Sequence, residues 1–249
     1  MAVNKAKVIT VTSVKGGTGK TINTLNIAGI LSQLNKKTII VDLDLYSGSI
    51  AASLNIRPET DIYTLNEDMM NNRFENIKDY TKAYNEHIDV LASPIDPRNV
   101  SKISTKFIEI LLSRLSMQYE VILIDTNHII DKINLIALDH SDTILYIITN
   151  DLMDIKNMKT MSAILKDMDK TNYKIILNEA KFGNTSYTSY DVETALEDKI
   201  DYVIPRSFYI KGIEKYIYNG NILTLDKFIL NSKGGQVIKK IVEDALKEE

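Results

Sequence analysis

The 249-residue chain contains no cysteine and no tryptophan, and only four prolines and ten glycines. Without cysteine it can form no disulfide, no zinc–thiolate site and no thiol nucleophile. No apolar run approaches the roughly 18 residues that a membrane-spanning helix needs. In MAVNKAKVIT, the first ten residues, a predicted strand begins at residue 7, which leaves too few residues for a signal peptide. We therefore expect a cytoplasmic protein with no integral membrane segment.

The chain also lacks an excess of positive charge. The chain carries 30 lysines and arginines against 33 acidic residues, which gives a formal net charge of −3. This balance argues against strong general affinity for nucleic acid, although a local basic patch is compatible with it. The hydrophobic content of 44% is ample for the core of one large domain. We expect residues 1–249 to form a single domain.

Short apolar runs alternate with amphipathic helical patterns along the chain. Seven runs have the composition of buried strands: residues 7–12, 38–41, 88–91, 121–124, 144–148, 174–177 and 201–204. Alternation of this kind predicts an α/β fold, with a mainly parallel twisted sheet and helices on both faces. Ligands of such sheets bind at the carboxyl ends of the strands.

The few glycines are concentrated in one loop, SVKGGTGKT at residues 13–21, between the first predicted strand and a helical pattern. Glycine lets the backbone approach an anion, and the helix start offers unpaired N–H groups. We therefore predict an ATP-binding P-loop, in which Lys20 reaches the β- and γ-phosphates and the Thr21 hydroxyl binds Mg²⁺. A tight turn without a ligand is the alternative. The predicted nucleotide-binding residues of the loop are Gly16, Gly17, Thr18, Gly19, Lys20, Thr21 and Ile22.

The loop departs from the usual P-loop at Val14, which stands where that pattern has glycine, and it carries an additional lysine, Lys15. KGGTGKT resembles the deviant Walker A loop of the ParA/MinD superfamily of P-loop ATPases. The resemblance implies that ATP joins two copies of the chain into a homodimer. Lys15 would then reach the nucleotide of the other subunit and act in catalysis beside Lys20. Alternatively, Lys15 is a solvated loop charge.

Aspartates follow two of the predicted strands. Asp42 and Asp44 end the run TIIVDLD, and Asp125 ends VILID. A carboxylate at such a position can hold Mg²⁺, and we predict Thr21, Asp42 and Asp125 as metal-binding residues. The resemblance implies that Asp44 is catalytic and orients the attacking water. Alternatively, Asp42 and Asp44 cap the turn or helix that follows.

Three further residues are implied by the resemblance as adenine contacts: Asn178 after a strand, and Pro205 with the adjacent Arg206 after the last strand. For Asn178, an ordinary turn residue is the alternative. The segment DTNHII, which begins at Asp125, contains none of the prolines that many relatives have there. Its His128 is interpreted as a polar surface residue.

Within the superfamily, residues 41–56, 91–104 and 138–161 look like the corresponding stretches of CpaE/TadZ proteins, which localise and help to assemble type IV-like (Flp) pili. That resemblance implies a partner in a pilus or secretion machine, and recruitment to the membrane or cell pole through it. A ParA-type DNA-partitioning ATPase is the main alternative, although the basic cluster Lys227, Lys233, Lys239 and Lys240 is diluted by acids. A MinD-type protein is less favoured, because the amphipathic segment at 236–249 ends in acids that anionic lipid would repel. We expect this segment to pack on the sheet.

Overall fold

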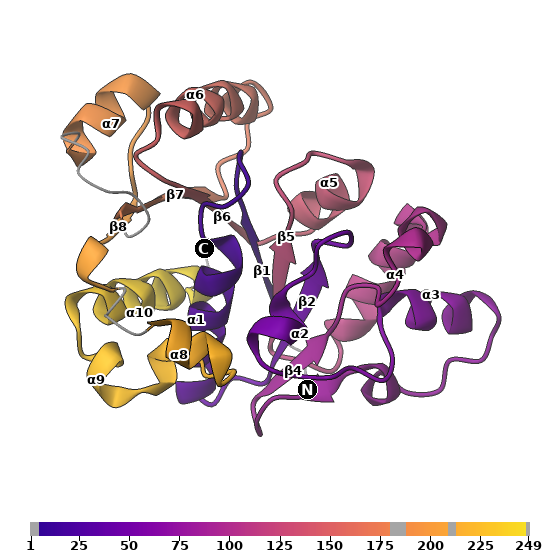
Figure 1. Ribbon diagram of the computed structural model, residues 1–249. Helices are drawn as coiled ribbons and strands as arrows, with labels where there is room; N and C mark the ends of the chain where they lie inside the picture. The colour runs from indigo at the N-terminus through magenta and orange to yellow at the C-terminus, as the bar shows by residue number, and fades with distance from the viewer. Residues whose placement is uncertain (1–4, 180–187, 209–212, 248–249) are drawn as a thin grey trace.

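An eight-stranded sheet organises the computed structural model, which describes residues 5–179, 188–208 and 213–247 (Figure 1). Its order is β3-β4-β2-β5-β1-β6-β7-β8, and every adjacent pair is parallel except β3 with β4. The strands are β1 (Lys7–Thr12), β2 (Thr38–Leu43), β3 (Lys82–Ala83), β4 (Ile88–Leu91), β5 (Val121–Thr126), β6 (Thr143–Ile148), β7 (Tyr173–Asn178) and β8 (Tyr202–Ile204).

The predicted α/β fold is confirmed, and each of the seven predicted runs is a strand. The sequence missed only β3, a two-residue antiparallel edge strand whose Lys82 and Ala83 are both exposed. This strand contributes nothing to the core, so it lacks the apolar pattern by which the others were found.

Helices occupy the connections between strands. The α-helices are α1 (Lys20–Gln33), α2 (Ile50–Ser53), α3 (Ile62–Met70), α4 (Thr105–Leu115), α5 (Lys132–Asp139), α6 (Leu152–Asp167), α7 (Ser189–Leu196), α8 (Ile213–Tyr218), α9 (Lys227–Leu230) and α10 (Lys233–Leu246). Shorter 3₁₀ turns are η1 (Ile77–Tyr80), η2 (Pro97–Lys102), η4 (Arg206–Phe208) and η5 (Leu223–Leu225).

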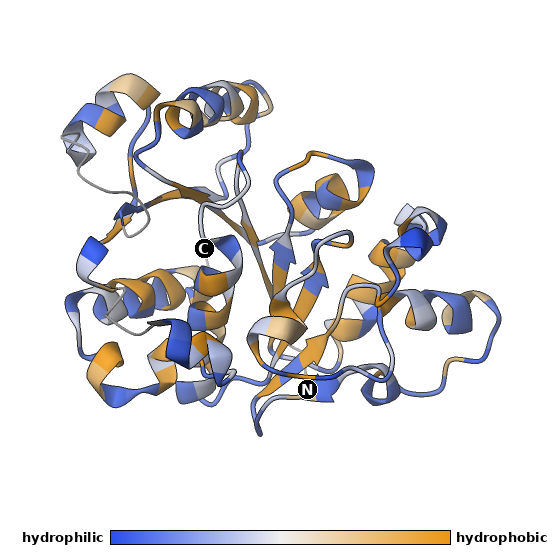
Figure 2. Ribbon diagram, in the orientation of Figure 1, coloured by the Kyte–Doolittle hydropathy of each residue, from blue (hydrophilic) through white to orange (hydrophobic). Residues whose placement is uncertain are grey.

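The two faces of the sheet carry different helices. Successive side chains of a strand point to opposite faces, and in β1 Ile9 packs with α1 and α10 while Val8 packs with α3 and α4. On the second face, α6 and α7 cover β6 and β7 through a separate apolar cluster. Figure 2 shows the hydrophobic strands at the centre, with hydrophilic tips on β2 and β5. Polar groups are thus placed at the carboxyl ends of otherwise apolar strands.

The carboxy-terminal amphipathic helix packs on the sheet as predicted. Ile238, Ile241 and Val242 of α10 are all at most 2% exposed, in the same cluster as α1. The apolar face of α10 is therefore already covered by this chain. Over the described ranges, no helix is both long and apolar enough to cross a bilayer.

The strand order creates a crevice beside β1. The chain leaves β1 for β2, two positions away on one side, and later adds β6, β7 and β8 on the other side. The carboxyl ends of β1, β2 and β5 meet where these directions diverge, which is where open parallel sheets bind ligands. The fold therefore brings the glycine loop and the predicted aspartates to one edge.

Helix α1 is held in place by η5. The Thr224 hydroxyl donates to the Asn26 carbonyl at 2.7 Å, and the Thr224 N–H donates to Asn26 Oδ1 at 3.2 Å. Gly29 makes this approach possible, because a Cβ there would lie 2.2 Å from Thr224 Oγ1 and 2.6 Å from Ile222 Cγ2.

We predict that Gly29→Ala lowers the free energy of unfolding. Overpacking costs about 1–3 kcal/mol, and the better helix propensity of alanine returns only about 1 kcal/mol. Urea denaturation followed by circular dichroism measures the change, with Ser113→Ala on the exposed side of α4 as the control. A Gly29→Ala protein as stable as the control would show that η5 does not pack tightly on α1.

Candidate nucleotide and magnesium site

The loop from Ser13 to Gly19 joins β1 to α1, and two of its glycines have positive φ. Gly17 has φ +79° and Gly19 has φ +98°, a conformation that glycine adopts without a steric penalty. Space restricts Gly19 as well, since a Cβ there would lie 2.7 Å from Asn178 Nδ2. These constraints explain why a glycine-poor chain concentrates glycine here.

The amino end of α1 points into this loop. Gly19 is its N-cap residue, no side chain of the described chain caps the helix, and its first turn has no acid. Helix N-termini present N–H groups and a partial positive charge to anions. Lys20, the first residue of the helix and 8% exposed, adds a full positive charge. The geometry suits a phosphate group.

Two hydroxyls of α1 hold Asp125 at the end of β5. Thr21 Oγ1 donates to Asp125 Oδ2 and Thr24 Oγ1 donates to Asp125 Oδ1, each at 2.8 Å. Ser49 Oγ lies 3.2 Å from Thr21 Oγ1 and extends the chain of hydroxyls. Burial raises the pKa of Asp125, while these hydrogen bonds and the charge of Lys20 lower it.

Asp42 lies opposite Asp125 in the register of β2 and β5, and both side chains are at most 1% exposed. Its oxygens accept the N–H groups of Asp44 at 3.2 Å and Ile50 at 3.1 Å. Asp42 therefore does cap the segment that follows β2. Burial first, and then the nearby charge of Asp125, raise the pKa of Asp42 well above its usual value.

This pair of buried carboxylates fits a magnesium ion. A divalent cation would offset the repulsion that raises the pKa of Asp42, and carboxylate and hydroxyl oxygens are the ligands that Mg²⁺ prefers. Within the described ranges, no three His, Cys, Asp or Glu side chains form a complete metal cage. An ion at Thr21, Asp42 and Asp125 would thus need water and phosphate oxygens as further ligands.

A cavity of about 330 Å³ opens beside these residues. Gly17, Gly19, Lys20 and Thr21 line it from the loop side, and Asp44 lines it from the end of β2. The half-exposed Asp44 is therefore placed beside the loop, whereas Asp42 is enclosed. Ile22, Leu25 and Ile217 of α8 supply an apolar wall.

The predicted adenine contacts are less closely grouped. Asn178 Nδ2 donates to the Thr18 carbonyl at 2.9 Å, so this amide holds the glycine loop in position. Pro205 and the exposed Arg206 follow β8 and are not among the described residues that line the cavity. Base recognition by Asn178, Pro205 and Arg206 stays a prediction.

Lys15 makes an ion pair within its own chain. Its ammonium lies 2.7 Å from Asp151 Oδ1, and the two side chains are 39% and 30% exposed. Asp151 is the N-cap of α6 and also accepts the N–H groups of Met153 and Asp154. The hydrogen bond from Lys15 lowers the pKa of Asp151, and Asp151 in turn raises the pKa of Lys15.

The proline-free segment after Asp125 is organised by asparagine. Asn127 Oδ1 accepts the Ile129 N–H at 2.7 Å and an Asn134 Nδ2 hydrogen at 2.8 Å. His128 is exposed, and its ring lies over Gly16. Sequence reasoning missed Thr24, Ser49, Asn127, Asn134 and Asp151, although Asp151 could have been found as an acid just beyond the carboxyl end of β6.

Comparison with known proteins agrees with this geometry. A family model described as an AAA domain matches residues 6–180. A virulence-plasmid ParA family protein of Chlamydia psittaci is 32% identical over 127 residues, which are 48% of each chain. The chain belongs to the ParA/MinD superfamily.

Other relatives of this ParA/MinD protein cover more of the chain. An uncharacterised ATP-binding protein of Methanocaldococcus jannaschii is 24% identical over 211 residues, 85% of this chain and 78% of that protein. The ParA family ATPase of Chlorobium tepidum has a TM-score of 0.82 at 21% identity, covering 95% and 98% of the two chains. MinD of Pyrococcus horikoshii, solved with Mg-ADP, has a TM-score of 0.79 at 20% identity, covering 97% and 96%. The last two show the shared fold.

We predict that Asp151→Asn makes Lys15 more reactive towards acetic anhydride at pH 8–9. The hydrogen bond from Lys15 to Asp151 raises the pKa of Lys15, so its loss leaves more neutral amine at a given pH. Asparagine caps helices as well as aspartate does, so α6 should be preserved. Competitive labelling with mass spectrometry measures the change, and Lys36, which pairs with Glu120, is the internal control. Equal reactivity in both proteins would show that the ion pair is not formed in solution.

Proposed function

We propose that the protein is a magnesium-dependent ATPase that acts as a dimerisation-gated nucleotide switch, for positioning or assembling a type IV-like (Flp) pilus machine. The observation that carries the switch is the placement of Lys15. It extends from the phosphate loop, yet it pairs with Asp151 and does not line the cavity beside Lys20. A lysine on a phosphate-binding loop that does not line the cavity of its own chain can instead contact the nucleotide of a second copy.

In the proposed mechanism, the loop glycines and the start of α1 bind the phosphates of ATP. Lys20 balances their charge, and Asn178 keeps the loop in place through the Thr18 carbonyl. Mg²⁺ held near Thr21, Asp42 and Asp125 would neutralise phosphate charge during transfer. Asp44, which lines the cavity, would accept a hydrogen bond from the attacking water and orient it.

Dimerisation would exchange one partner of Lys15 for another. In the single chain the lysine is neutralised by Asp151. In the dimer it would leave Asp151 for the γ-phosphate of the facing subunit and stabilise the charge that develops in the transition state. Partly exposed ion pairs contribute little stability, so the exchange should be energetically accessible.

Apolar side chains near Lys15 support a face-to-face dimer. Ile129 and Ile130 are 56% and 50% exposed, and Leu152 and Met153 at the start of α6 are 52% and 54% exposed. They lie in the segment before α5 and in the first turn of α6, which begins directly after Asp151. Covering them with a second copy would remove apolar surface from water and favour association.

The pilus role is supported by the three sequence stretches that resemble CpaE/TadZ proteins. Two of them meet beside the site, since a Cβ on Gly48 would lie 1.7 Å from Ser93 Oγ and 2.8 Å from Asp42 Oδ2. The third contains the Asp151 that pairs with Lys15. The resemblance therefore involves segments that shape the nucleotide site. The ParA relative on a virulence plasmid keeps DNA partitioning as the second candidate.

We predict that Asp44→Ala protein is monomeric with ADP and dimeric with ATP and Mg²⁺, because bound ATP persists when turnover is blocked. Light scattering measures the mass. Adding Lys15→Gln should prevent or weaken the dimer, whereas Lys36→Gln, in an exposed ion pair on another part of the surface, should not. A protein that binds ATP yet stays monomeric would contradict the switch.

The same Asp44→Ala dimer distinguishes the branches of the superfamily. We expect it to bind neither nonspecific duplex DNA at physiological salt nor vesicles that contain anionic lipid. DNA binding that weakens steeply as salt rises would instead assign the chain to the partitioning branch. ATP-dependent binding to vesicles would assign it to a MinD-like branch.

A further inference from the structure

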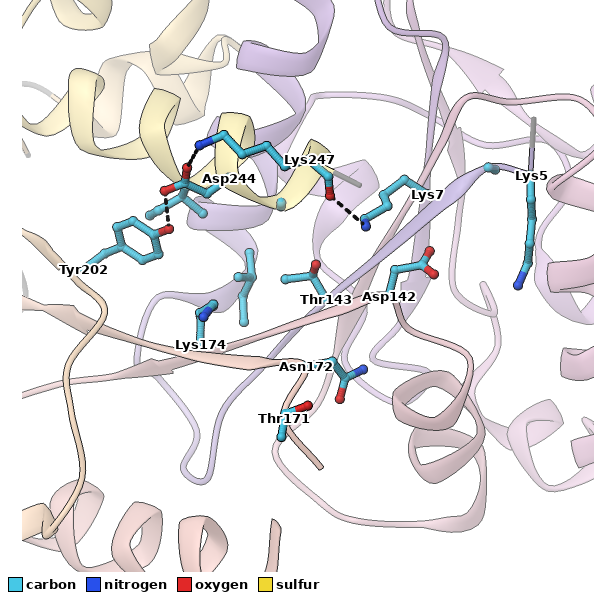
Figure 3. A pocket seen from close by; sticks show the side chains of 14 residues that line it. Lys5, Lys7, Asp142, Thr143, Thr171, Asn172, Lys174, Tyr202, Asp244 and Lys247 are labelled. Carbon is cyan, nitrogen blue, oxygen red and sulfur yellow. Dashed lines mark hydrogen bonds and ion pairs between the residues drawn. The ribbon is translucent and has the colours of Figure 1, made fainter. Parts of the chain in front are cut away.

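A second, larger cavity lies at the amino ends of the strands, whereas the nucleotide site lies at their carboxyl ends. It has a volume of about 490 Å³ and is formed where β1, β6, β7 and β8 begin and α10 ends (Figure 3). Lys7, the first residue of β1, lines this cavity, whereas the glycine loop follows Thr12 at the other end of the same strand. At about 3.3 Å per residue, the strand separates the two sites by roughly 17 Å.

The cavity has an apolar base and polar walls. Ala6, Leu145, Ile241 and Ala245 are between 1% and 5% exposed and form its base. Thr143, Thr171 and Asn172 add hydroxyl and amide groups to the wall. Pockets of about 300–1,000 Å³ with a few polar groups are the usual size for small-molecule ligands. The volume exceeds the requirement of a single inorganic ion.

Four lysines from three parts of the fold line this cavity, and two are neutralised by nearby acids. Lys247 lies 2.5 Å from Asp244 Oδ1, and Lys174 lies 3.6 Å from Asp201. Asp244 also accepts the Tyr202 hydroxyl at 2.7 Å. These pairs leave Lys5 and Lys7 as the cations that matter for a ligand.

Lys5 and Lys7 have no carboxylate partner among the residues that the structure describes. Among the described residues, the Lys7 ammonium donates to the Lys247 carbonyl, at the long distance of 3.4 Å. Figure 3 shows the two lysines on either side of Asp142, whose Oδ2 accepts the Val8 N–H at 2.7 Å. The described part of this side of the cavity therefore holds two ammonium groups and one carboxylate, which leaves a net positive charge.

We propose that this cavity binds a phosphorylated small molecule of about mononucleotide size. A phosphate monoester carries a charge of about −1.5 to −2 at pH 7, which suits two ammonium groups better than a single carboxylate would. Lysine binds phosphate as a point charge. The phosphate contacts the Lys5 and Lys7 ammonium groups on the side away from the Asp142 carboxylate, and the body of the ligand fills the cavity towards Asn172 and Tyr202.

The neighbouring surface favours a small ligand over a nucleic acid. Beyond the cavity, Lys170 lies 2.6 Å from Asp139 and Lys166 lies 3.1 Å from Asp198. Lysines that are already neutralised offer no continuous track for a long phosphate backbone.

Calorimetric titration of the full chain with AMP tests the proposal. The protein is first saturated with ADP and Mg²⁺, so that the P-loop site is occupied. We expect one further site with a Kd below about 1 mM, and no binding of adenosine, which lacks the phosphate. No AMP binding up to 5 mM would overturn the proposal, and affinity for inorganic phosphate equal to that for AMP would overturn the mononucleotide size.

Paired variants assign the site. Lys5→Gln/Lys7→Gln should weaken AMP binding at least about tenfold, as expected for two lost charge-assisted hydrogen bonds. Lys106→Gln/Lys227→Gln, at exposed positions on α4 and α9, makes the same change in net charge and should leave binding unchanged. Equal weakening in both variants would show a nonspecific charge effect, and no weakening in the first would place AMP elsewhere. ADP binding at the P-loop should be equal in all three proteins, which separates this test from the fate of the ATPase proposal.

Discussion

The rest of the site depends on the two hydrogen bonds that α1 donates to Asp125. Thr21 and Thr24, one helical turn apart, each donate a hydroxyl to a different oxygen of this carboxylate at the end of β5. The contact fixes the rotation of α1 about its axis and therefore the direction of the N–H groups at its start. Because Asp125 lies opposite Asp42 in the sheet, the same contact places the glycine loop and the start of α1 beside two buried carboxylates. A polar group this deeply buried is costly unless hydrogen-bonded, so the buried Asp125 carboxylate needs the hydroxyls of Thr21 and Thr24 in this position.

The sequence predicted the sheet well because β1, β2 and β5 are buried on both faces and therefore read as continuous apolar runs. It also predicted Gly17 and Gly19, whose positive φ only glycine tolerates easily. It could not predict the ion pair between Lys15 and Asp151, because the residues are 136 positions apart and strand order alone brings them together. The amide contacts of Asn127 were invisible for a different reason. An asparagine after a strand is compatible with a turn, a ligand contact or a structural bridge, and the chain contains many asparagines.

Asp42 fits both of the roles that the sequence leaves as alternatives, which are metal binding and capping. Its oxygens accept the N–H groups of Asp44 and Ile50, which is the capping role. It is also buried beside Asp125, and burial first, then the charge of Asp125, raise its pKa. The cap uses both carboxylate oxygens, so an asparagine, with one carbonyl oxygen, would lose one of these two hydrogen bonds. A carboxylate at this position is therefore explained by the cap, and the proposed magnesium ion would offset the repulsion between Asp42 and Asp125.

The lysines of the two sites lie at opposite ends of the parallel strands. At the carboxyl edge, Lys20 is buried at the start of α1, while Lys15 is half-exposed and paired with Asp151. At the amino edge, Lys5 and Lys7 face a cavity with less acid than base. Most other lysines with a described partner form surface pairs, such as Lys36 with Glu120 and Lys170 with Asp139, and these contribute little stability. Exposed lysines without an ion pair in the described chain, such as Lys106 and Lys227, lie on separate helices, whereas the positive groups of the two sites are gathered in concave places. Such a distribution favours compact phosphorylated ligands over extended polyanions, because a concave site concentrates charge on one group whereas a polyanion needs it spread along a face.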